Sequence, residues 1–304
     1  MFYLFLIFAG FLGLAVGSFI NVLTLRWNPA ENNQITKIVR GRSHCLHCGQ
    51  TLKWFEIIPL LSFVFLRGRC RYCHRKLSLQ YPLVEGLTAL IFTGVARRIL
   101  NFDFFSYHFF SDPRANFWVA AIIVIWFFYS AILITLSVID LRHYLLPDKI
   151  IFPAIIVSLL ANLSFYSLSL MRGNSFPKYG LNFLGPYADV VNIHFNVLTS
   201  AIAGTLVLFS FLFLIYVLSR GRAMGLGDVK LAILMGLMLG FSAGIVSLLF
   251  SFVIGAIVSL IIILTTKKKL KDAVPFGPFL ALVVLAVFFF GQTIANFYFS
   301  LFNV

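Results

Sequence analysis

Apolar residues follow one another in long, nearly uncharged runs along most of this 304-residue chain. A helix that crosses a bilayer needs about 20 mostly apolar residues. Runs of this kind begin near Phe2, Leu77, Phe117, Ile150, Phe195, Leu231 and Val274. The composition agrees, because 61% of the residues are hydrophobic and only 11% are charged, which excludes the ordinary soluble classes. The pattern predicts a membrane protein built from spanning helices.

The run from Leu231 to Thr266 is too long for one span and slightly short for two full ones. Basic residues lie on both sides of it, namely Arg220, Arg222, Lys267, Lys268 and Lys269. Because cytoplasmic loops carry the excess of Lys and Arg, we expect the run to cross twice, with a turn near Gly240 to Gly244. The fold class expected is all-α, a polytopic transmembrane bundle of about eight spans.

The basic residues also predict the orientation. The run from Met1 to Leu25 has no Lys or Arg before it and no small-residue cleavage signature, so we expect a retained helix and not a signal peptide. Lys and Arg begin at Arg26, which places the N-terminus outside and the first loop in the cytoplasm. Under this topology 19 of the 24 basic residues are cytoplasmic. The net charge of +14 then reflects loops beside anionic lipid, and no nucleic-acid partner is expected.

These boundaries suggest three parts: a first transmembrane helix at 1–25, a cytoplasmic loop at 26–80 and a membrane domain at 81–304. The first loop holds every cysteine of the chain, as two Cys-x-x-Cys pairs, Cys45 with Cys48 and Cys70 with Cys73. This spacing is typical of a zinc ribbon with four thiolate ligands. The neighbouring His44, His47 and His74 could replace one cysteine, and a metal-free thiol or redox role is the alternative. A loop this small buries little core, so a structural zinc would contribute folding energy.

Two acidic residues stand at span ends on the cytoplasmic side. Asp140 closes the third span, and Asp228 follows Gly225-Leu-Gly227, whose glycines permit a bend and a close backbone approach. Ionisable groups at membrane depth tend to face a wet interior site. Two carboxylates that share one proton can hydrolyse a peptide bond, one as base toward water and the other as acid. The structural alternative is that Asp140 and Asp228 cap helices at aqueous boundaries.

Two further acidic residues admit structural explanations. Asp148 follows Pro147 in a pair that is typical of the cap opening the fourth span. Glu85 lies inside the second span, where it is either a functional group or a residue near enough to the interface to stay hydrated. Neither residue can be assigned from the sequence pattern alone.

At these residues the chain resembles the type IV prepilin peptidases, bifunctional leader peptidases and N-methyltransferases of the Gly-x-Gly-Asp class of membrane aspartyl proteases. The resemblance covers nearly the whole chain in eight ordered elements. They are Gly17-Ser-Phe-Ile-Asn21-Val with Arg26, the two Cys-x-x-Cys pairs, Ile58-Pro-Leu-Leu-Ser62, Arg67-Gly-Arg-Cys70, Tyr81-Pro-Leu-Val-Glu85, Asp140 with Leu146-Pro-Asp148, Gly225-Leu-Gly-Asp228-Val-Lys230, and Pro275-Phe-Gly-Pro-Phe279.

The resemblance implies that Asp140 and Asp228 are the catalytic pair, supported by Gly225, Gly227, Asp148, Glu85 and Lys230, the last orienting the site or meeting lipid phosphate. It implies cleavage of the basic leader of a prepilin or pseudopilin on the cytoplasmic side of the bacterial inner membrane. Methylation of the new N-terminal residue with S-adenosylmethionine is expected to follow, and the cysteine loop is expected to stabilise the substrate-facing or methyltransferase region.

The chain departs from the family pattern at Glu56 and Ile57, which replace Asp and Asn in a Trp-Tyr-Asp-Asn-Ile-Pro segment. The missing Asn amide could have served a polar cofactor, so a peptidase without methyltransferase activity is one alternative. A proton-coupled transporter using Asp140, Asp228 and Glu85 is another, although its carboxylates should lie near mid-bilayer. A noncatalytic scaffold for pilus or secretion assembly is a third. The outer loop from Arg172 to His194 has no evident physical role.

Overall fold

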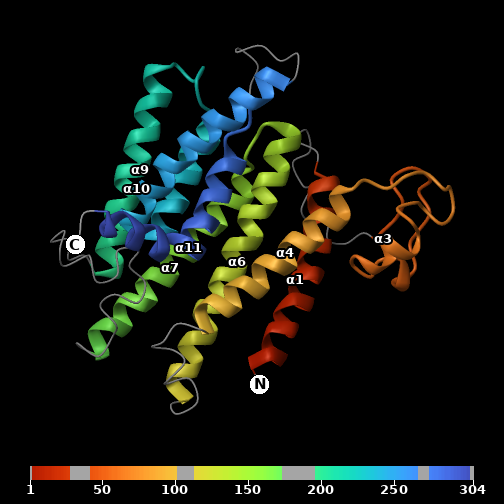
Figure 1. Cartoon of the computed structure of the whole chain (residues 1–304), viewed down its shortest axis with the longest axis horizontal. Helices are drawn as coiled ribbons and strands as arrows, with labels where there is room; N and C mark the ends of the chain where they lie inside the picture. The colour runs from red at the N-terminus through yellow and green to blue at the C-terminus, as the bar shows by residue number, and fades with distance from the viewer. Residues whose placement is uncertain (1, 28–41, 101–112, 173–195, 266–273, 302–304) are drawn as a thin grey trace. The chain divides into compact units, whose positions relative to one another are not determined.

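The computed structural model describes residues 2–27, 42–100, 113–172, 196–265 and 274–301 (Figure 1). Helices make up most of these residues, so the expected all-helical class is confirmed. Six of the helices are long and apolar enough to cross a membrane. The chain divides into two compact units, residues 1–139 and residues 140–304. The predicted outer loop, apart from Arg172 at its start, lies outside the described residues.

In the first unit, α1 (Phe2–Leu25) packs along α4 (Gln80–Leu100) through small residues. A Cβ at Gly13 would lie 2.6 Å from Ala89 Cα, and a Cβ at Gly17 would lie 2.7 Å from Glu85 Cα. Such close backbone approach is typical of membrane helix pairs. Residues later in α1 contact residues earlier in α4, so the two helices are antiparallel. The predicted second span requires this direction.

The third helix of this unit is α6 (Pro113–His143), whose residues up to Ile139 belong to the unit. Ile134 of α6 packs in a buried cluster with Ile20 of α1 and Val84 of α4. Further along, the rings of Phe92 and Phe127 stack with their centroids 4.2 Å apart. These contacts fix three helices around one apolar core.

Between α1 and α4 lies the cysteine module, defined here as the described residues 42–79, which contains the single turn η1 (Trp54–Glu56) and the short helix α3 (Leu61–Phe65). Hydrogen bonds anchor its exit to the end of α1. The Gln80 side chain lies 3.3 Å from both Asn21 Oδ1 and Thr24 Oγ1, and Asn21, which is fully buried, donates to the Tyr81 carbonyl. At the other end, the Arg26 side chain, one residue after α1, donates to the Arg42 carbonyl at 3.0 Å, so the described module begins and ends beside the same helix end.

The second unit contains the end of α6 and four more helices. They are α7 (Asp148–Arg172), α9 (Val197–Leu218), α10 (Leu226–Thr265) and α11 (Gly277–Ser300). The central helix is α10, which packs against each of the other three. Its apolar contact with α11 includes Ala243, Val283 and Val287.

The chain of α10 reverses direction at Gly240. Gly240 has a φ of 74°, which favours glycine. The glycines on either side of it show in which direction the chain runs along α9. A Cβ at Gly236 would touch Thr205, one at Gly240 would touch Ser200, and one at Gly244 would touch Leu208. Contacts therefore run toward the start of α9 and then back again, and Figure 1 shows both ends of α10 on the same side of the turn. The predicted turn is confirmed.

Side chains from two helices satisfy the backbone groups that this turn exposes. The Asn162 amide of α7 donates to the Leu237 carbonyl at 2.9 Å, and the Phe241 N–H donates to Ser200 Oγ of α9 at 3.1 Å. Buried backbone groups without such partners would be costly in a bilayer. With α10 counted twice and α4 included, the described helices agree with the predicted count of about eight spans.

Candidate active site and metal centre

The second unit brings two carboxylates together at helix ends. Asp140 lies in the last turn of α6 and is 5% exposed, while Asp228 lies in the first turn of α10 and is half-buried. Gly277 contacts the Asp140 carboxylate, and both Gly277 and Gly227, the residue before Asp228, pack against Leu146, so the two aspartates lie around one packing site. Carboxyl groups that come into contact do not readily ionise together and can share one proton.

Each carboxylate receives a backbone hydrogen bond from a glycine. The Gly277 N–H at the start of α11 donates to Asp140 Oδ2 at 3.0 Å, and the backbone of Gly225, just before α10, is bonded to Asp228. A Cβ at position 277 would lie 2.7 Å from Asp140 Oδ2, so only glycine fits there without displacement. The first N–H groups of a helix lack intrahelical partners and carry partial positive charge, which suits them to hold an anion.

Leu146, in the link between α6 and α7, packs against Gly227 and Gly277, the glycines beside the two aspartates. A Cβ at Gly227 would lie 2.9 Å from Leu146 Cβ, and a Cβ at Gly277 would lie 3.3 Å from Leu146 Cδ2. Gly227 is therefore required for close packing, while Gly225 lies beside the Asp228 carboxylate. The two glycines before Asp228 serve different purposes, which their spacing alone could not distinguish.

Asp148 and Lys230 form an ion pair within the same unit. Lys230 Nζ lies 2.6 Å and 2.8 Å from the two Asp148 carboxylate oxygens and 5.5 Å from the centre of the Phe152 ring. Asp148 is the first residue of α7, and the Pro147 carbonyl accepts the first helical hydrogen bonds, so the expected helix start is confirmed. The ion pair occupies both Asp148 oxygens and fixes how Lys230 lies beside the turn that carries Asp228.

Glu85 has its partners in the first unit. It is 5% exposed, its Oε2 accepts the Leu60 N–H at 2.8 Å, and the Ser18 side chain hydrogen-bonds to it as well. Leu60 has a φ of 58°, an unusual conformation for a non-glycine residue, and it precedes α3. The structure therefore gives Glu85 a role that the sequence did not suggest, as the anchor that holds the cysteine module to α1 and α4.

The cysteine module contains two copies of one knuckle, 25 residues apart. The Cys45 N–H bonds to the Gln50 carbonyl and the Cys70 N–H to the Arg75 carbonyl, both at 2.9 Å. Antiparallel bridges enclose each pair, His44 with Thr51 and Arg69 with Lys76. A left-handed residue follows each second cysteine, Gly49 in the first knuckle and His74 in the second.

The four sulfur atoms of Cys45, Cys48, Cys70 and Cys73 lie within 4.8 Å of one another, and those of Cys45 and Cys73 are 3.9 Å apart. Four thiolates around a tetrahedral zinc, with Zn–S near 2.3 Å, are separated by about 3.8 Å, so the cluster fits such an ion. Burial works to raise the pKa of the Cys45 thiol, but hydrogen bonds from the Cys48 and His47 backbone outweigh it and lower the pKa to about 7. Although a backbone hydrogen bond from Gln50 works to lower it, burial and the neighbouring Cys45 and Cys73 raise the pKa of the Cys48 thiol to about 11, so thiolate formation is favoured at Cys45 first.

Glu56, one of the departures from the family pattern, is buried inside the module. Its Oε2 accepts the Lys53 N–H at 2.8 Å and thereby caps η1, and its Oε1 lies 3.8 Å from Arg71 Nη1 in the second knuckle. The Arg71 guanidinium also lies over the Phe55 ring, 5.5 Å from its centre. The residue at position 56 therefore ties the η1 turn to the second knuckle, which is a structural role.

Sequence reasoning missed three of these functional contacts. Gly277 belongs to the Pro275–Phe279 segment, to which the sequence assigned no role. A glycine at the start of a span nevertheless indicates a close approach. The Leu60 N–H that Glu85 accepts could not be found from residue types, because any residue supplies a backbone N–H. The buried polar link from Gln80 to Asn21 depends on a helix pairing that the linear pattern does not give.

Comparison with known proteins agrees with this architecture. Residues 11–99 match the bacterial peptidase A24 N-terminal domain, and residues 127–260 match the type IV leader peptidase family. A prepilin leader peptidase/N-methyltransferase from Aeromonas hydrophila is 31% identical over 94% of this chain and 90% of its own length. Proteins of the same name from Legionella pneumophila and Stutzerimonas stutzeri are 31% and 28% identical over 95% and 94% of this chain, covering 92% and 91% of their own lengths. No solved structure matches.

The fold and the site define a polytopic helical membrane protein with an acidic pair at its helix ends and a four-cysteine module. The chain belongs to the type IV leader peptidase family, and it is a membrane-bound peptidase of that family.

Proposed function

We propose that this protein cleaves the leader peptide of type IV prepilins or pseudopilins with Asp140 and Asp228, and then methylates the new N-terminal residue using S-adenosylmethionine. The observation that carries the proposal is that the starts of α10 and α11 bring Asp228 and Asp140 to one packing site around Leu146, where the Gly277 N–H holds Asp140. The printed names of the relatives from Aeromonas and Legionella, prepilin leader peptidase/N-methyltransferase, support the substrate and both activities.

In the proposed cleavage, the two carboxylates share one proton and hold a water between them and the scissile carbonyl. The ionised carboxylate takes a proton from the water as its oxygen bonds to the carbonyl carbon. The protonated carboxyl hydrogen-bonds to the carbonyl oxygen, and a proton then passes to the departing amide nitrogen as the C–N bond breaks. The roles of base and acid belong to the pair and not to one residue. Gly277 N–H stabilises the charge on Asp140 and fixes its orientation.

The proposed division of labour follows the chain. Residues 1–25 anchor the protein, residues 26–80 serve methyl transfer, and residues 81–304 cut the leader. A zinc ion bound by Cys45, Cys48, Cys70 and Cys73 would cross-link the two knuckles and hold the loop in shape, because the loop has little apolar core. The positive-inside distribution supports an active site that faces the cytoplasm, where the basic leader of a membrane-inserted prepilin lies. Asp148 and Lys230 brace the cleavage site, and Glu85 braces the module.

Cleavage of a prepilin by the detergent-purified protein tests the catalytic pair. Wild type should cut, whereas Asp140→Asn and Asp228→Asn should lose cleavage, because an amide can neither take the proton from water nor supply one. Asp148→Asn serves as the matched control, because it makes the same change at a half-exposed carboxylate that is paired with Lys230 and should keep most of the cleavage. Mass spectrometry of the product with S-adenosylmethionine should show a gain of about 14 Da, the mass of one methylene, which follows from replacing N–H by N–CH₃ in the cofactor's methyl transfer.

The outcomes separate the remaining candidates. If both aspartate variants cut like wild type, the pair is not catalytic and other groups carry out the cleavage. If wild type leaves the substrate intact, a scaffold role becomes the better explanation. If the leader is cut but no mass is gained with S-adenosylmethionine, the chain is a peptidase alone. A transporter would leave the substrate intact in every arm of the experiment.

A further inference from the structure

The cysteine module carries an apolar surface that nothing in the described chain covers. Trp54 is 78% exposed, Val64 is 69% exposed and Phe65 is 81% exposed. Trp54 belongs to η1 and the other two belong to α3, and these two elements pack against each other. We call Trp54, Phe55, Leu61, Val64 and Phe65, all of them exposed, the apolar edge of the module. An exposed apolar cluster of this size on a small module marks an interaction surface.

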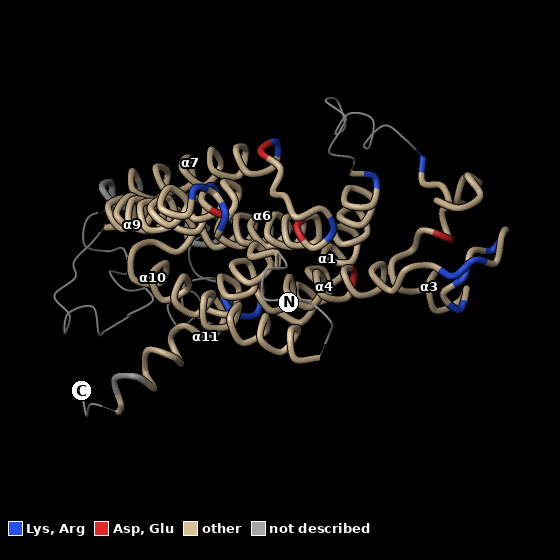
Figure 2. The backbone as a smooth tube through the Cα atoms, turned by 90° about the horizontal axis from the view of Figure 1, so that it is seen from above, with Lys and Arg blue, Asp and Glu red and all other residues tan. Residues whose placement is uncertain are grey.

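The charges around this edge indicate what it contacts. The module contains seven basic residues and one acidic residue, Glu56, whose side chain is buried. Lys53 directly precedes the edge, and Arg67 and Arg69 follow it by two and four residues, all three exposed. Figure 2 shows several basic positions of the module together near α3, on the side away from α1 and α4. Aromatic and apolar residues bordered by Lys and Arg are typical of surfaces that insert into the headgroup region of anionic membranes.

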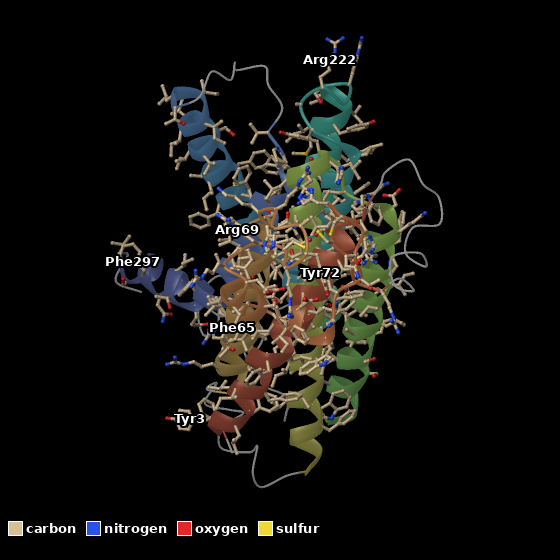
Figure 3. All side chains as sticks on the ribbon, turned by 90° about the vertical axis from the view of Figure 1, so that its right-hand side faces the viewer. Tyr3, Phe65, Arg69, Tyr72, Arg222 and Phe297 are labelled. Carbon is tan, nitrogen blue, oxygen red and sulfur yellow. The ribbon has the colours of Figure 1, made fainter. Side chains whose placement is uncertain are left out.

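The arrangement of the module relative to α1 agrees with that partner. Gln80 ties the exit of the module to the end of α1, a candidate membrane span, and the Arg26 guanidinium just after α1 donates to the Arg42 carbonyl at 3.0 Å. The module therefore cannot move far from the bilayer surface. Figure 1 shows α3 beside the C-terminal half of α1 and not beyond its end. In Figure 3 Phe65 lies closer than Arg69 to the level of Tyr3, which marks the N-terminal end of α1. Along the direction of a spanning helix, the apolar group is therefore deeper and the guanidinium shallower.

We propose that the apolar edge inserts into the membrane leaflet on the module's side, with Trp54 and Phe65 at the level of the upper acyl chains and with Lys53, Arg67 and Arg69 on anionic phospholipid headgroups. The inference does not depend on the proposed enzymatic function. Docking in this way holds the module in the headgroup layer in addition to its tether at Gln80. A second copy of the chain and a protein substrate are the other occupants that such a surface could accept.

Photo-crosslinking of the full-length protein in nanodiscs tests this. The photoreactive residue p-benzoylphenylalanine replaces Phe65 in one variant, Phe8 of α1 in a lipid-facing control, and the exposed polar Gln50 of the first knuckle in a second control. In phosphatidylglycerol nanodiscs, position 65 should yield lipid adducts at a level comparable with position 8 and well above position 50. Adducts with a second copy only, no adducts at position 65, or equal yields at positions 50 and 65 would each overturn the proposal.

A separate experiment tests the contact between the basic residues and anionic headgroups. Arg67→Gln combined with Arg69→Gln should lower the lipid-adduct yield at position 65 several-fold in phosphatidylglycerol nanodiscs. The unsubstituted module should show a similar loss when phosphatidylcholine replaces phosphatidylglycerol, because both changes remove the same attraction. Equal yields in the two lipids would show that headgroup charge does not hold the module. The yield at position 8 should stay constant throughout, which separates loss of docking from loss of reconstitution.

Discussion

The Gly277 N–H donates a 3.0 Å hydrogen bond to Asp140 Oδ2, joining two residues 137 positions apart in the chain. Gly277 is the first residue of α11, and Asp140 lies in the last turn of α6. A carboxylate at the start of a helix is stabilised by the unpaired N–H groups there. The orientation of the proposed catalytic pair therefore depends on where α11 begins.

Gly277→Ala should lower kcat/KM for leader cleavage by at least about tenfold, because the added Cβ would lie 2.7 Å from Asp140 Oδ2 and displace the carboxylate. Gly86→Ala in α4 is the matched control, since nothing lies within 4 Å of a Cβ there. The control should keep activity within about twofold. Steady-state kinetics with a prepilin substrate measures both variants. Wild-type activity in Gly277→Ala would show that this contact does not position the pair.

Asp148→Asn should reduce cleavage by less than about tenfold, whereas the same change at Asp140 or Asp228 should abolish it. Asp148 is half-exposed and paired with Lys230, and exposed ion pairs contribute only about 0.2 to 1 kcal/mol. A double-mutant cycle with Lys230→Met checks the explanation, because the two losses should not add if each removes the same pair. Abolished cleavage in Asp148→Asn would instead place Asp148 in the chemistry.

Much of this fold was accessible from the sequence because lipid imposes strong rules. Spans follow from the length of apolar runs, and the reversal at Gly240 followed from where the basic residues lie. The partners of Glu85 and Gly277 were not accessible. Both contacts pair a carboxylate with a backbone N–H, and a backbone N–H has no residue-type signature. The interpretation of Lys230 as a contact for lipid phosphate likewise could not anticipate Asp148, which is 82 residues away in the chain.

Gly240→Ala should destabilise the second unit strongly, by more than about 2 kcal/mol, because position 240 has a φ of 74° and a Cβ would lie 2.5 Å from Ser200 Oγ. Gly244→Ala is the control within the same helix, where the nearest atom is Leu208 Cδ1 at 3.3 Å. We expect a clear fall in Tm in detergent for the first variant and a small change for the second. Equal Tm values would show that the turn does not require glycine.

Glu85→Ala should release the link that holds the cysteine module to α4. The Leu60 N–H would lose its acceptor, so amide hydrogen exchange in residues 58–62 should become about 5- to 150-fold faster, as expected when about 1 to 3 kcal/mol of local protection is lost. Glu85→Gln keeps an acceptor oxygen and should show a smaller effect. Hydrogen exchange with mass spectrometry of the full-length protein measures both. Unchanged exchange in Glu85→Ala would remove the anchoring role.

Cys73→Ser should lower bound zinc from about one ion per chain to near zero, whereas His74→Gly should leave it unchanged, because the four sulfur atoms cluster within 4.8 Å without a histidine. His74 occupies the left-handed position that Gly49 fills in the first knuckle, so glycine should also relieve backbone strain of about 1 kcal/mol. Gly49→Ala is the reciprocal control and should destabilise the module by a similar amount. Metal analysis of the purified protein, repeated after treatment with a chelator, measures the zinc content. Loss of zinc in His74→Gly would identify that histidine as a ligand and exclude a site made of four cysteines alone.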